Sequence, residues 1–339
     1  MHTYNPRNVL ITGGAGFIGC HFVRHLLRTD RHVRIVNLDL LTYAGSLDNL
    51  NALPDPERHQ VVQGTICDRP LVDRLLREHD IDTIIHFAAE SHVDRSITGP
   101  AAFIETNVIG TFTLLEAARD FWLRQQAWDT GQCRFHHVST DEVYGTLDTD
   151  EPAFCETTPN APNSPYAASK AASDHFVRAY HSTYGLSTVT THCSNNYGPY
   201  QHHEKLIPTV IRSCLQNQPI PVYGDGSNMR DWLYVEDHCV AIDLVLRRGR
   251  TGDTYNIGGD NCWNNLGVVH LICEVLAELT GHSASGFTRL IHFVTDRPGH
   301  DWRYAVDTTK LRNELGWSPT ETFKTGIRKT AAWYLTQYT

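Results

Sequence analysis

Short runs of apolar residues that end at glycine or polar residues alternate with longer amphipathic stretches in the first half of the chain. The short runs predict buried strands, whereas the longer stretches have the spacing of helices. The predicted strands cover residues 9–12, 33–39, 83–87 and 135–138, and the predicted helices cover residues 17–27, 69–78 and 101–121. Because strands and helices alternate, the pattern predicts an α/β fold built on a doubly wound parallel sheet.

The pattern is less regular in the second half of the chain. Several Pro and Gly residues interrupt the stretch from 195 to 226, and a helix, a strand and a second helix are predicted at 235–247, 254–257 and 266–279. We therefore expect residues 1–194 to form the main domain, with segments near 232–259 returning to its sheet. Residues 195–339 are expected to form mainly a smaller C-terminal domain with discontinuous boundaries.

The composition narrows the classes of function. The 339 residues carry 29 Lys and Arg against 38 Asp and Glu, a net charge of −9, and no basic cluster, so nucleic-acid binding is not expected. Nine scattered cysteines without a C-x-x-C motif indicate reduced thiols rather than a disulfide framework. There is neither a signal peptide nor a run of about 18 apolar residues, so we expect a soluble cytoplasmic protein without membrane contact.

A glycine-rich turn lies between the first predicted strand and the first predicted helix. Gly13, Gly16 and Gly19 lack side chains, which allows backbone N–H groups to approach a pyrophosphate. Asp39 ends the second strand, where a carboxylate accepts hydrogen bonds from ribose hydroxyls and repels a 2′-phosphate. Together these residues favour a site for NAD rather than NADP. The alternative is a glycine turn that binds nothing and a solvated Asp.

Tyr166 and Lys170 lie four residues apart in a predicted helix that Ser164 caps, with Pro165 in its first turn. Near a nicotinamide, the Lys170 ammonium would lower the pKa of the phenol, and the phenolate could take a proton from a substrate hydroxyl. The alternative is an exposed Tyr and Lys on a surface helix.

A polar stretch follows the fourth predicted strand. In it, Thr140 could bind the reacting hydroxyl, and Asp141 and Glu142 are adjacent carboxyl groups. A general acid beside a general base is what the elimination of water requires. The alternative is that both carboxylates merely stabilise a helix N-terminus.

These motifs carry a resemblance over nearly the whole chain. The glycine turn, the Ser-Thr-Asp-Glu-Val-Tyr-Gly stretch and the Tyr-x-x-x-Lys pair resemble the extended short-chain dehydrogenase/reductases and, more narrowly, the dTDP-glucose 4,6-dehydratases. Further matching segments are residues 41–45, 88–96, 195–200, 204–208, 230–235 and 296–301. The Thr-Asp-Glu triplet is the most discriminating part, because related sugar epimerases and decarboxylases carry other residues there.

The resemblance implies bound NAD as cofactor, dTDP-glucose as substrate, and dTDP-4-keto-6-deoxyglucose plus water as products. It implies that Tyr166 removes the 4-hydroxyl proton during oxidation at C4. Glu142 is then the base at C5 and Asp141 the acid at the C6 hydroxyl, before C6 is reduced and the cofactor is regenerated.

The resemblance also implies the binding residues, transferred position by position. The implied cofactor-binding residues are Gly13, Gly16, Phe17, Ile18, Gly19, Asp39, Leu40, Leu41, Thr42, Thr65, Ile66, Phe87, Ala88, Ala89, Ser91, Thr106, Tyr166, Lys170 and Asn196. The implied substrate-binding residues are Ser91, Thr140, Asn195, Lys205, Leu206, Pro221, Val222, Tyr223, Arg230, Asn265, Asp296, Arg297, Pro298, Gly299 and His300. Thr65 replaces an Asp that usually contacts the adenine, and Leu40 replaces a Lys. No metal site is expected, and the His pairs 136/137 and 202/203 are interpreted as structural or solvent-facing.

Family members form homodimers by packing two helices from each subunit, so the stretch 101–121 and the helix with Tyr166 are the candidates for a dimer interface; ordinary packing on the sheet is the alternative. Two other functions remain open. One is an NAD-dependent epimerase, decarboxylase or dehydratase that acts on another nucleotide hexose. The other is a dinucleotide-binding regulator without turnover, which the presence of Tyr166, Lys170 and both carboxyl groups disfavours.

Overall fold

A seven-stranded sheet forms the centre of the larger part of the molecule in the computed structural model, which describes residues 3–338. All its strands are parallel, in the order β10-β6-β5-β4-β1-β2-β3. The strands are β1 (Asn8–Thr12), β2 (Arg34–Asp39), β3 (His59–Gln63), β4 (Thr83–His86), β5 (Arg134–Thr140), β6 (Thr188–Cys193) and β10 (Thr254–Ile257). The doubly wound α/β prediction is therefore confirmed.

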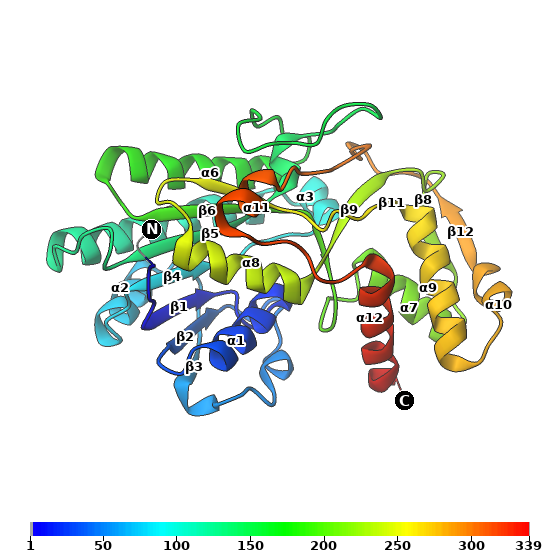
Figure 1. The fold of residues 1–339 in the computed structure, drawn as a ribbon, viewed down its shortest axis with the longest axis horizontal. Helices are drawn as coiled ribbons and strands as arrows, with labels where there is room; N and C mark the ends of the chain where they lie inside the picture. Colours follow the sequence, from blue (N-terminus) through cyan, green and yellow to red (C-terminus); the bar gives the residue numbers. More distant parts are fainter. Residues whose placement is uncertain (1–2, 339) are drawn as a thin grey trace.

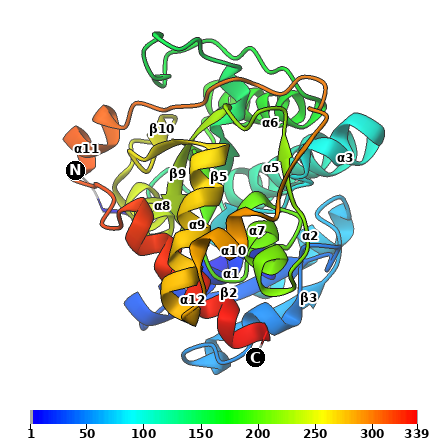
Figure 2. The ribbon, with the colours of Figure 1, turned by 90° about the vertical axis from the view of Figure 1, so that its right-hand side faces the viewer.

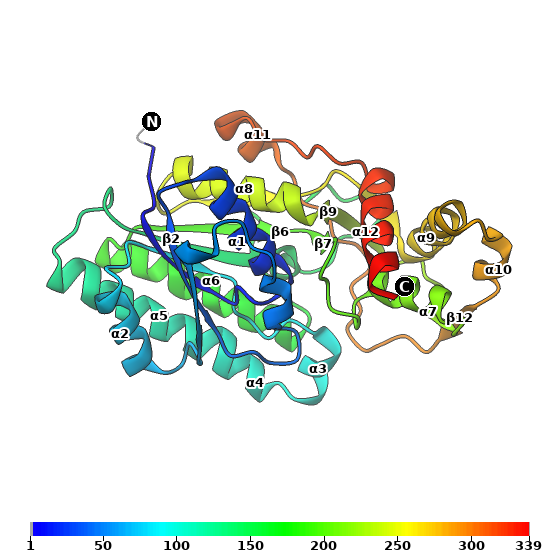
Figure 3. The same cartoon turned by 90° about the horizontal axis from the view of Figure 1, so that it is seen from below.

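Helices cover both faces of this sheet (Figures 1 and 3). One face packs against α1 (Phe17–Thr29), α8 (Val235–Arg248) and α11 (Thr309–Leu315). The other face packs against α2 (Arg69–Glu78), α5 (Thr111–Ala118) and α6 (Pro165–Tyr184). Successive residues of a strand point to opposite faces, so Val9 and Ile11 join the first core and Leu10 joins the second. Both faces are thus buried, as a parallel sheet requires.

A smaller lobe lies beyond the carboxyl ends of the strands, on the right in Figure 1 and facing the viewer in Figure 2. It has an apolar core of its own, distinct from the two apolar clusters on the faces of the main sheet. Its strands are β7 (Asn195–Tyr197), β8 (Ile220–Tyr223), β9 (Met229–Tyr234), β11 (Cys262–Asn264) and β12 (Ile291–Val294), and its helices are α7 (Leu206–Leu215), α9 (Asn265–Thr280), α10 (Ala284–Thr288) and α12 (Phe323–Tyr338). The chain leaves this lobe at α8, returns to the main sheet through β10, and then re-enters it.

Shorter helices complete the chain. They are η1 (Leu47–Leu50), η2 (Pro56–Arg58), α3 (Val93–Thr98), α4 (Ala101–Phe103) and η5 (Asp141–Tyr144), together with two π-helical stretches, η3 (Ile104–Gly110) and η4 (Arg119–Gln125). The helix predicted at 101–121 is therefore continuous but contains π-turns. Within residues 3–338, no helix combines the length and the apolar character needed to span a membrane.

Candidate active site

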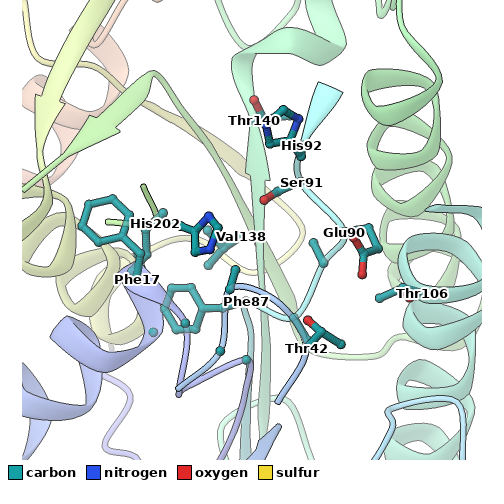
Figure 4. A pocket seen from close by; sticks show the side chains of 18 of the residues that line it. Phe17, Thr42, Phe87, Glu90, Ser91, His92, Thr106, Val138, Thr140 and His202 are labelled. Atoms are coloured by element: carbon teal, nitrogen blue, oxygen red, sulfur yellow. The ribbon is translucent and has the colours of Figure 1, made fainter. Parts of the chain in front are cut away.

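The carboxyl ends of five strands of the main sheet meet around one cavity of about 310 Å³. Its wall includes Gly13 after β1, Asp39 at the end of β2, Phe87 after β4, Thr140 at the end of β5 and Cys193 at the end of β6. Figure 4 shows how side chains from these separate loops gather around the cavity. A doubly wound sheet binds its ligand at this edge.

The glycine turn forms the floor of the cavity beside the start of α1. Gly13 has φ +74°, a conformation that favours glycine, and a Cβ on Gly19 would lie 2.2 Å from the Gly13 carbonyl oxygen. Gly16 precedes α1 and provides no capping side chain, so the first N–H groups of the helix remain available. A backbone cradle at the N-terminus of a 13-residue helix fits the pyrophosphate of a dinucleotide.

Asp39 is held in place before any ligand arrives. Its carboxylate accepts hydrogen bonds from the backbone N–H groups of Ala15, at 2.9 Å, and Leu41, at 2.8 Å. Because each carboxylate oxygen can accept more than one hydrogen bond, the group can still bind two ribose hydroxyls. Leu40 and Thr65 also lie at the wall of the cavity, whereas Leu41 does not.

Helix α6 fixes Tyr166 and Lys170. The Ser164 hydroxyl accepts a hydrogen bond from the Ala167 N–H at 3.1 Å, as the predicted cap requires. Lys170 Nζ donates to the Val138 carbonyl oxygen at 2.9 Å. Burial, followed by the Glu142 charge, raises the pKa of Tyr166 well above its ordinary value, and the Thr140 hydroxyl opposes this rise. Burial, rather than the Lys170 charge, is therefore the dominant influence on the pKa of the phenol.

The two adjacent carboxyl groups lie in different electrostatic surroundings. Asp141 is buried, and burial together with the Glu142 charge raises its pKa well above its usual range. Its Oδ2 has no hydrogen-bond partner among the described residues. Burial also raises the pKa of Glu142, but the cations Lys205, Arg230 and Arg297 oppose this rise. The rise is therefore larger for Asp141 than for Glu142, which suits Asp141 to the role of acid and Glu142 to that of base.

The cations near Glu142 come from outside the main sheet. Lys205 precedes α7 and donates to the Ser91 carbonyl oxygen at 3.0 Å. Arg230, on β9, is buried and donates to carbonyl oxygens of residues 229, 301 and 302. Arg297 forms an ion pair with Asp94 at 2.9 Å. The smaller lobe therefore supplies the positive charge that acts on Glu142.

Most of the residues transferred by resemblance lie together. The cavity is lined by all five expected catalytic residues and by every expected cofactor-binding residue except Leu41. Among the expected substrate-binding residues, Ser91, Thr140, Asn195 and Lys205 line it. The remaining ones, which do not, are Leu206, Pro221, Val222, Tyr223, Arg230, Asn265, Asp296, Arg297, Pro298, Gly299 and His300.

Several residues of the cavity wall were not predicted. They are Leu38, Tyr43, Ala44, Gly45, Gly64, Glu90, His92, Val138, Ser139, Cys193, Ser194, Gln201 and His202. Tyr43, Glu90 and His92 belong to segments that resemble the family, so the resemblance could have identified them as cavity residues. His202 lies at the cavity, whereas His136 and His137 are buried in β5. Within the described part of the chain, no group of three or more His, Cys, Asp or Glu residues is arranged to hold a metal ion.

Comparisons with known proteins agree with this geometry. The family model for GDP-mannose 4,6 dehydratase matches residues 10–330. A dTDP-glucose 4,6-dehydratase of Xanthomonas campestris is 57% identical, over 97% of this chain and 93% of the relative. The crystal structure of a dTDP-glucose 4,6-dehydratase from Streptomyces venezuelae with NAD and TYD bound is 46% identical, with a TM-score of 0.86 and 97% of each chain covered. A structure of the Bacillus anthracis enzyme in complex with NAD is 44% identical, with a TM-score of 0.85 over 97% of each chain. The chain therefore belongs to the dTDP-glucose 4,6-dehydratase family.

Proposed function

We propose that the protein converts dTDP-glucose to dTDP-4-keto-6-deoxyglucose and water with bound NAD⁺. The observation that carries this proposal is the pair Asp141 and Glu142, which lies at the same cavity as Tyr166 and Lys170. An epimerase or a decarboxylase has no need for a protonated acid beside a base, whereas elimination of water needs both.

The residues present fit NAD⁺. The glycine cradle excludes side chains from the place that a pyrophosphate would take, and Asp39 would accept the ribose hydroxyls and repel a 2′-phosphate. When bound, NAD⁺ supplies the oxidation at C4 and the matching reduction at C6, so the cofactor is regenerated in each cycle.

The protein's own groups would move the protons. Tyr166 takes the proton of the 4-hydroxyl, and Thr140 orients that hydroxyl. Glu142, where Lys205 and Arg230 oppose the rise in pKa that burial causes, removes the C5 proton once the C4 ketone has acidified it. Asp141, kept protonated by burial, donates to the leaving C6 hydroxyl.

We propose that the nucleotide lies against the smaller lobe. The segment 221–223 would flank the base, with Tyr223 placed to stack on it. Arg230 and Arg297 would face the diphosphate, since guanidinium groups bind its oxygens in pairs. Residues 1–194, with the returning segments 232–259, then act as the NAD-binding Rossmann domain. Residues 195–339 act mainly as the nucleotide-sugar-binding domain.

We further propose a homodimer and a cytoplasmic location. The outer surface of η3, α5 and α6 exposes Ile104, Ile109, Phe112 and Phe176, an apolar patch that a second copy would cover. We call this patch the α5–α6 surface. All nine cysteines are free, which suits a reducing compartment.

The test is to incubate the purified protein with dTDP-glucose, without added NAD⁺, and to measure the mass of the nucleotide sugar. Loss of one water without net formation of NADH is expected. An unchanged mass, even after NAD⁺ is supplied, would overturn the proposal. UDP-glucose in a parallel reaction distinguishes a different nucleotide preference from a different reaction.

A further inference from the structure

Three buried histidines lie on adjacent strands of the main sheet, each directly before a residue that lines the cavity. His86 on β4 is paired in register with His137 on β5, and their rings are 5.3 Å apart. His192 on β6 is paired in register with Ser139, two residues beyond His137. All three imidazoles are buried, and all lie between the sheet and the helices on the α6 side.

Asp174 of α6 joins two of these histidines. His192 Nε2 lies 3.0 Å from one carboxylate oxygen, and His137 Nε2 lies 3.2 Å from the other. On the far side, His192 Nδ1 lies 2.6 Å from the Tyr144 hydroxyl, which donates to Asn256 on β10 at 2.9 Å. The His192 contact has hydrogen-bond geometry, whereas His137 Nε2 and the second carboxylate oxygen have no hydrogen-bond partner among the described residues. The carboxylate is therefore held by His192, which is anchored through Tyr144 to a third strand, and it lies close to the His137 ring.

Asp174 is one helical turn beyond Lys170. Residues four apart on a helix share a face, and both side chains of this pair are buried against the sheet. Burial lowers the pKa of Lys170, and the charge of Asp174 is the main influence that opposes this. The pKa of Asp174 itself is held well below its usual range by the two imidazoles, despite burial.

The surroundings of His137 and His86 favour the neutral imidazole, so neither ring adds a positive charge that would compete with Lys170 for Asp174. Burial and the nearby Lys170 charge lower the pKa of His137 to about 4, and the pKa of His86 lies well below its usual value for the same reasons. The ionisable groups around Lys170 are Tyr166 and Asp174 on α6, His137 on β5, His192 and Cys193 on β6, His86 on β4, and Asp141, Glu142 and Tyr144 of η5. Of these, Asp141 and Glu142 belong to the elimination step and change protonation during it.

We propose that Asp174 is a positioning residue for Lys170: held by His192 and lying beside His137, it supplies the fixed negative charge that keeps Lys170 an ammonium group at the Val138 carbonyl. A buried ammonium without a counter-ion loses its proton, and a neutral amine would not stabilise the Tyr166 phenolate. The proposal rests on the catalytic role given to Lys170 in the proposed function. It adds to that role the residue that maintains the charge of Lys170.

The chain is well suited to a direct test, because it contains only five lysines, at 170, 205, 310, 324 and 329. The protein is labelled with lysine carrying ¹³C at the ε carbon, and the pKa of each ammonium is followed by NMR without substrate. The Lys170 signal is assigned from its disappearance in Lys170→Arg. In Asp174→Asn, the pKa of Lys170 is expected to fall by about one unit or more, while the other four lysines keep their titration.

Ser173→Ala is the matched control. Ser173 is the neighbouring buried residue of α6, and its hydroxyl donates to the Asn107 carbonyl oxygen at 2.6 Å. The control removes a buried hydrogen bond of the same helix without touching the charge, so the Lys170 titration is expected to stay at the wild-type value. If Asp174→Asn lowers the melting temperature but leaves the Lys170 titration unchanged, Asp174 is merely structural and the proposal is wrong.

Turnover gives the second reading. With dTDP-glucose, the alkaline limb of the kcat profile of Asp174→Asn is expected to move to lower pH by the same amount as the Lys170 pKa, and Asp174→Glu is expected to restore most of it. If the wild-type protein does not turn over dTDP-glucose, the proposed function fails, while the NMR titration still decides the role of Asp174.

Should Asp174→Asn not fold, His192→Gln serves as a second variant, because it removes the hydrogen bond from His192 to the carboxylate. That variant is expected to lower the Lys170 pKa by a smaller amount, and an unchanged titration there would overturn the proposal.

Discussion

Two carboxyl groups adjacent in the chain can perform opposite tasks only if their surroundings differ. Asp141 is turned into the protein, where its Oδ2 finds no hydrogen-bond partner among the described residues, so the neutral form is favoured. Glu142 is only partly buried and is surrounded by cations from the smaller lobe, so ionisation costs less. The division of labour between acid and base follows from burial on one side and positive charge on the other.

Glu142→Gln should separate oxidation from elimination. The variant keeps Tyr166 and Lys170, so C4 is oxidised, but without the base at C5 the reaction stalls. Product formation is expected to fall at least about 100-fold, while reduced cofactor accumulates on the enzyme, seen at 340 nm.

Asp141→Asn is the paired variant: it also blocks elimination, but it removes a carboxyl whose native pKa is raised. Because ionisation of that carboxyl costs stability as the pH rises, Asp141→Asn should raise the melting temperature more at pH 8 than at pH 5. Normal turnover by Glu142→Gln would exclude this residue as the base.

Lys205→Gln should move the acidic limb of the pH profile. The Lys205 charge lowers the pKa of Glu142, and the base must be ionised to act. Without that charge, the pKa of Glu142 rises, so activity is lost at a higher pH, with a shift of about one unit. Lys310→Gln is the control, because Lys310 pairs with Asp253 at 3.0 Å, away from the cavity. Equal profiles for Lys205→Gln and the wild type would show that Lys205 does not tune Glu142.

At the scale of elements, the periodic parts of the chain were predictable and the polar buried parts were not. The strand at Thr254–Ile257 and the helix at Arg69–Glu78 agree with their predicted bounds. Two strands of the main sheet, β3 and β6, were not predicted. β3 is an edge strand with polar residues at both ends, and β6 is Thr- and His-rich although every residue in it is buried. Its polar side chains are satisfied by tertiary partners such as Asp174, which a local pattern cannot show.

The same division holds for the candidate site: its local motifs were predictable, and its contacts between distant segments were not. The glycine turn and the Tyr166–Lys170 pair were visible because strand, turn and helix follow one another locally. The approach of Lys205 and Arg230 to Glu142 depends on loops and strands far apart in the chain, so residue types alone could not reveal it. His202 at the cavity wall and Asp174 beneath Lys170 were missed for the same reason.

Gly19→Ala should damage the cofactor cradle far more than Gly16→Ala. A Cβ on Gly19 would lie 2.2 Å from the Gly13 carbonyl oxygen and 2.7 Å from the Gly14 Cα, so the turn must move. A Cβ on Gly16 would lie 3.2 Å from the same oxygen. We expect Gly19→Ala to lose about 1–3 kcal/mol of stability and most of its NAD⁺ affinity, measured by calorimetry on protein stripped of nucleotide. Gly16→Ala should lose clearly less of both, and equal losses would mean that steric closure of the turn does not govern binding.

At the scale of the whole molecule, the main sheet and the smaller lobe contribute different chemistry to one cavity. The main sheet supplies the cofactor cradle, Tyr166, Lys170 and both carboxyl groups, while the smaller lobe supplies the cations that oppose the rise in the pKa of Glu142. The α5–α6 surface lies on the main sheet, away from the smaller lobe (Figure 3). A dimer formed there would leave the mouth of the cavity free and would stiffen the helix that carries Tyr166.

Phe176→Glu should therefore convert a dimer into a monomer. Phe112 and Phe176 belong to adjacent helices, have ring centroids 6.1 Å apart and are 40% and 39% exposed, so a carboxylate between them would be buried without a partner in the interface. Analytical ultracentrifugation at about 1 µM, a concentration at which a dimer interface of ordinary size remains closed, is expected to give one dimer for the wild type and a monomer for the variant. Phe293→Glu is the control, because Phe293 is an aromatic residue on β12 of the smaller lobe that is also exposed, at 53%. If Phe293→Glu dissociates the dimer and Phe176→Glu does not, the smaller lobe and not the α5–α6 surface forms the interface.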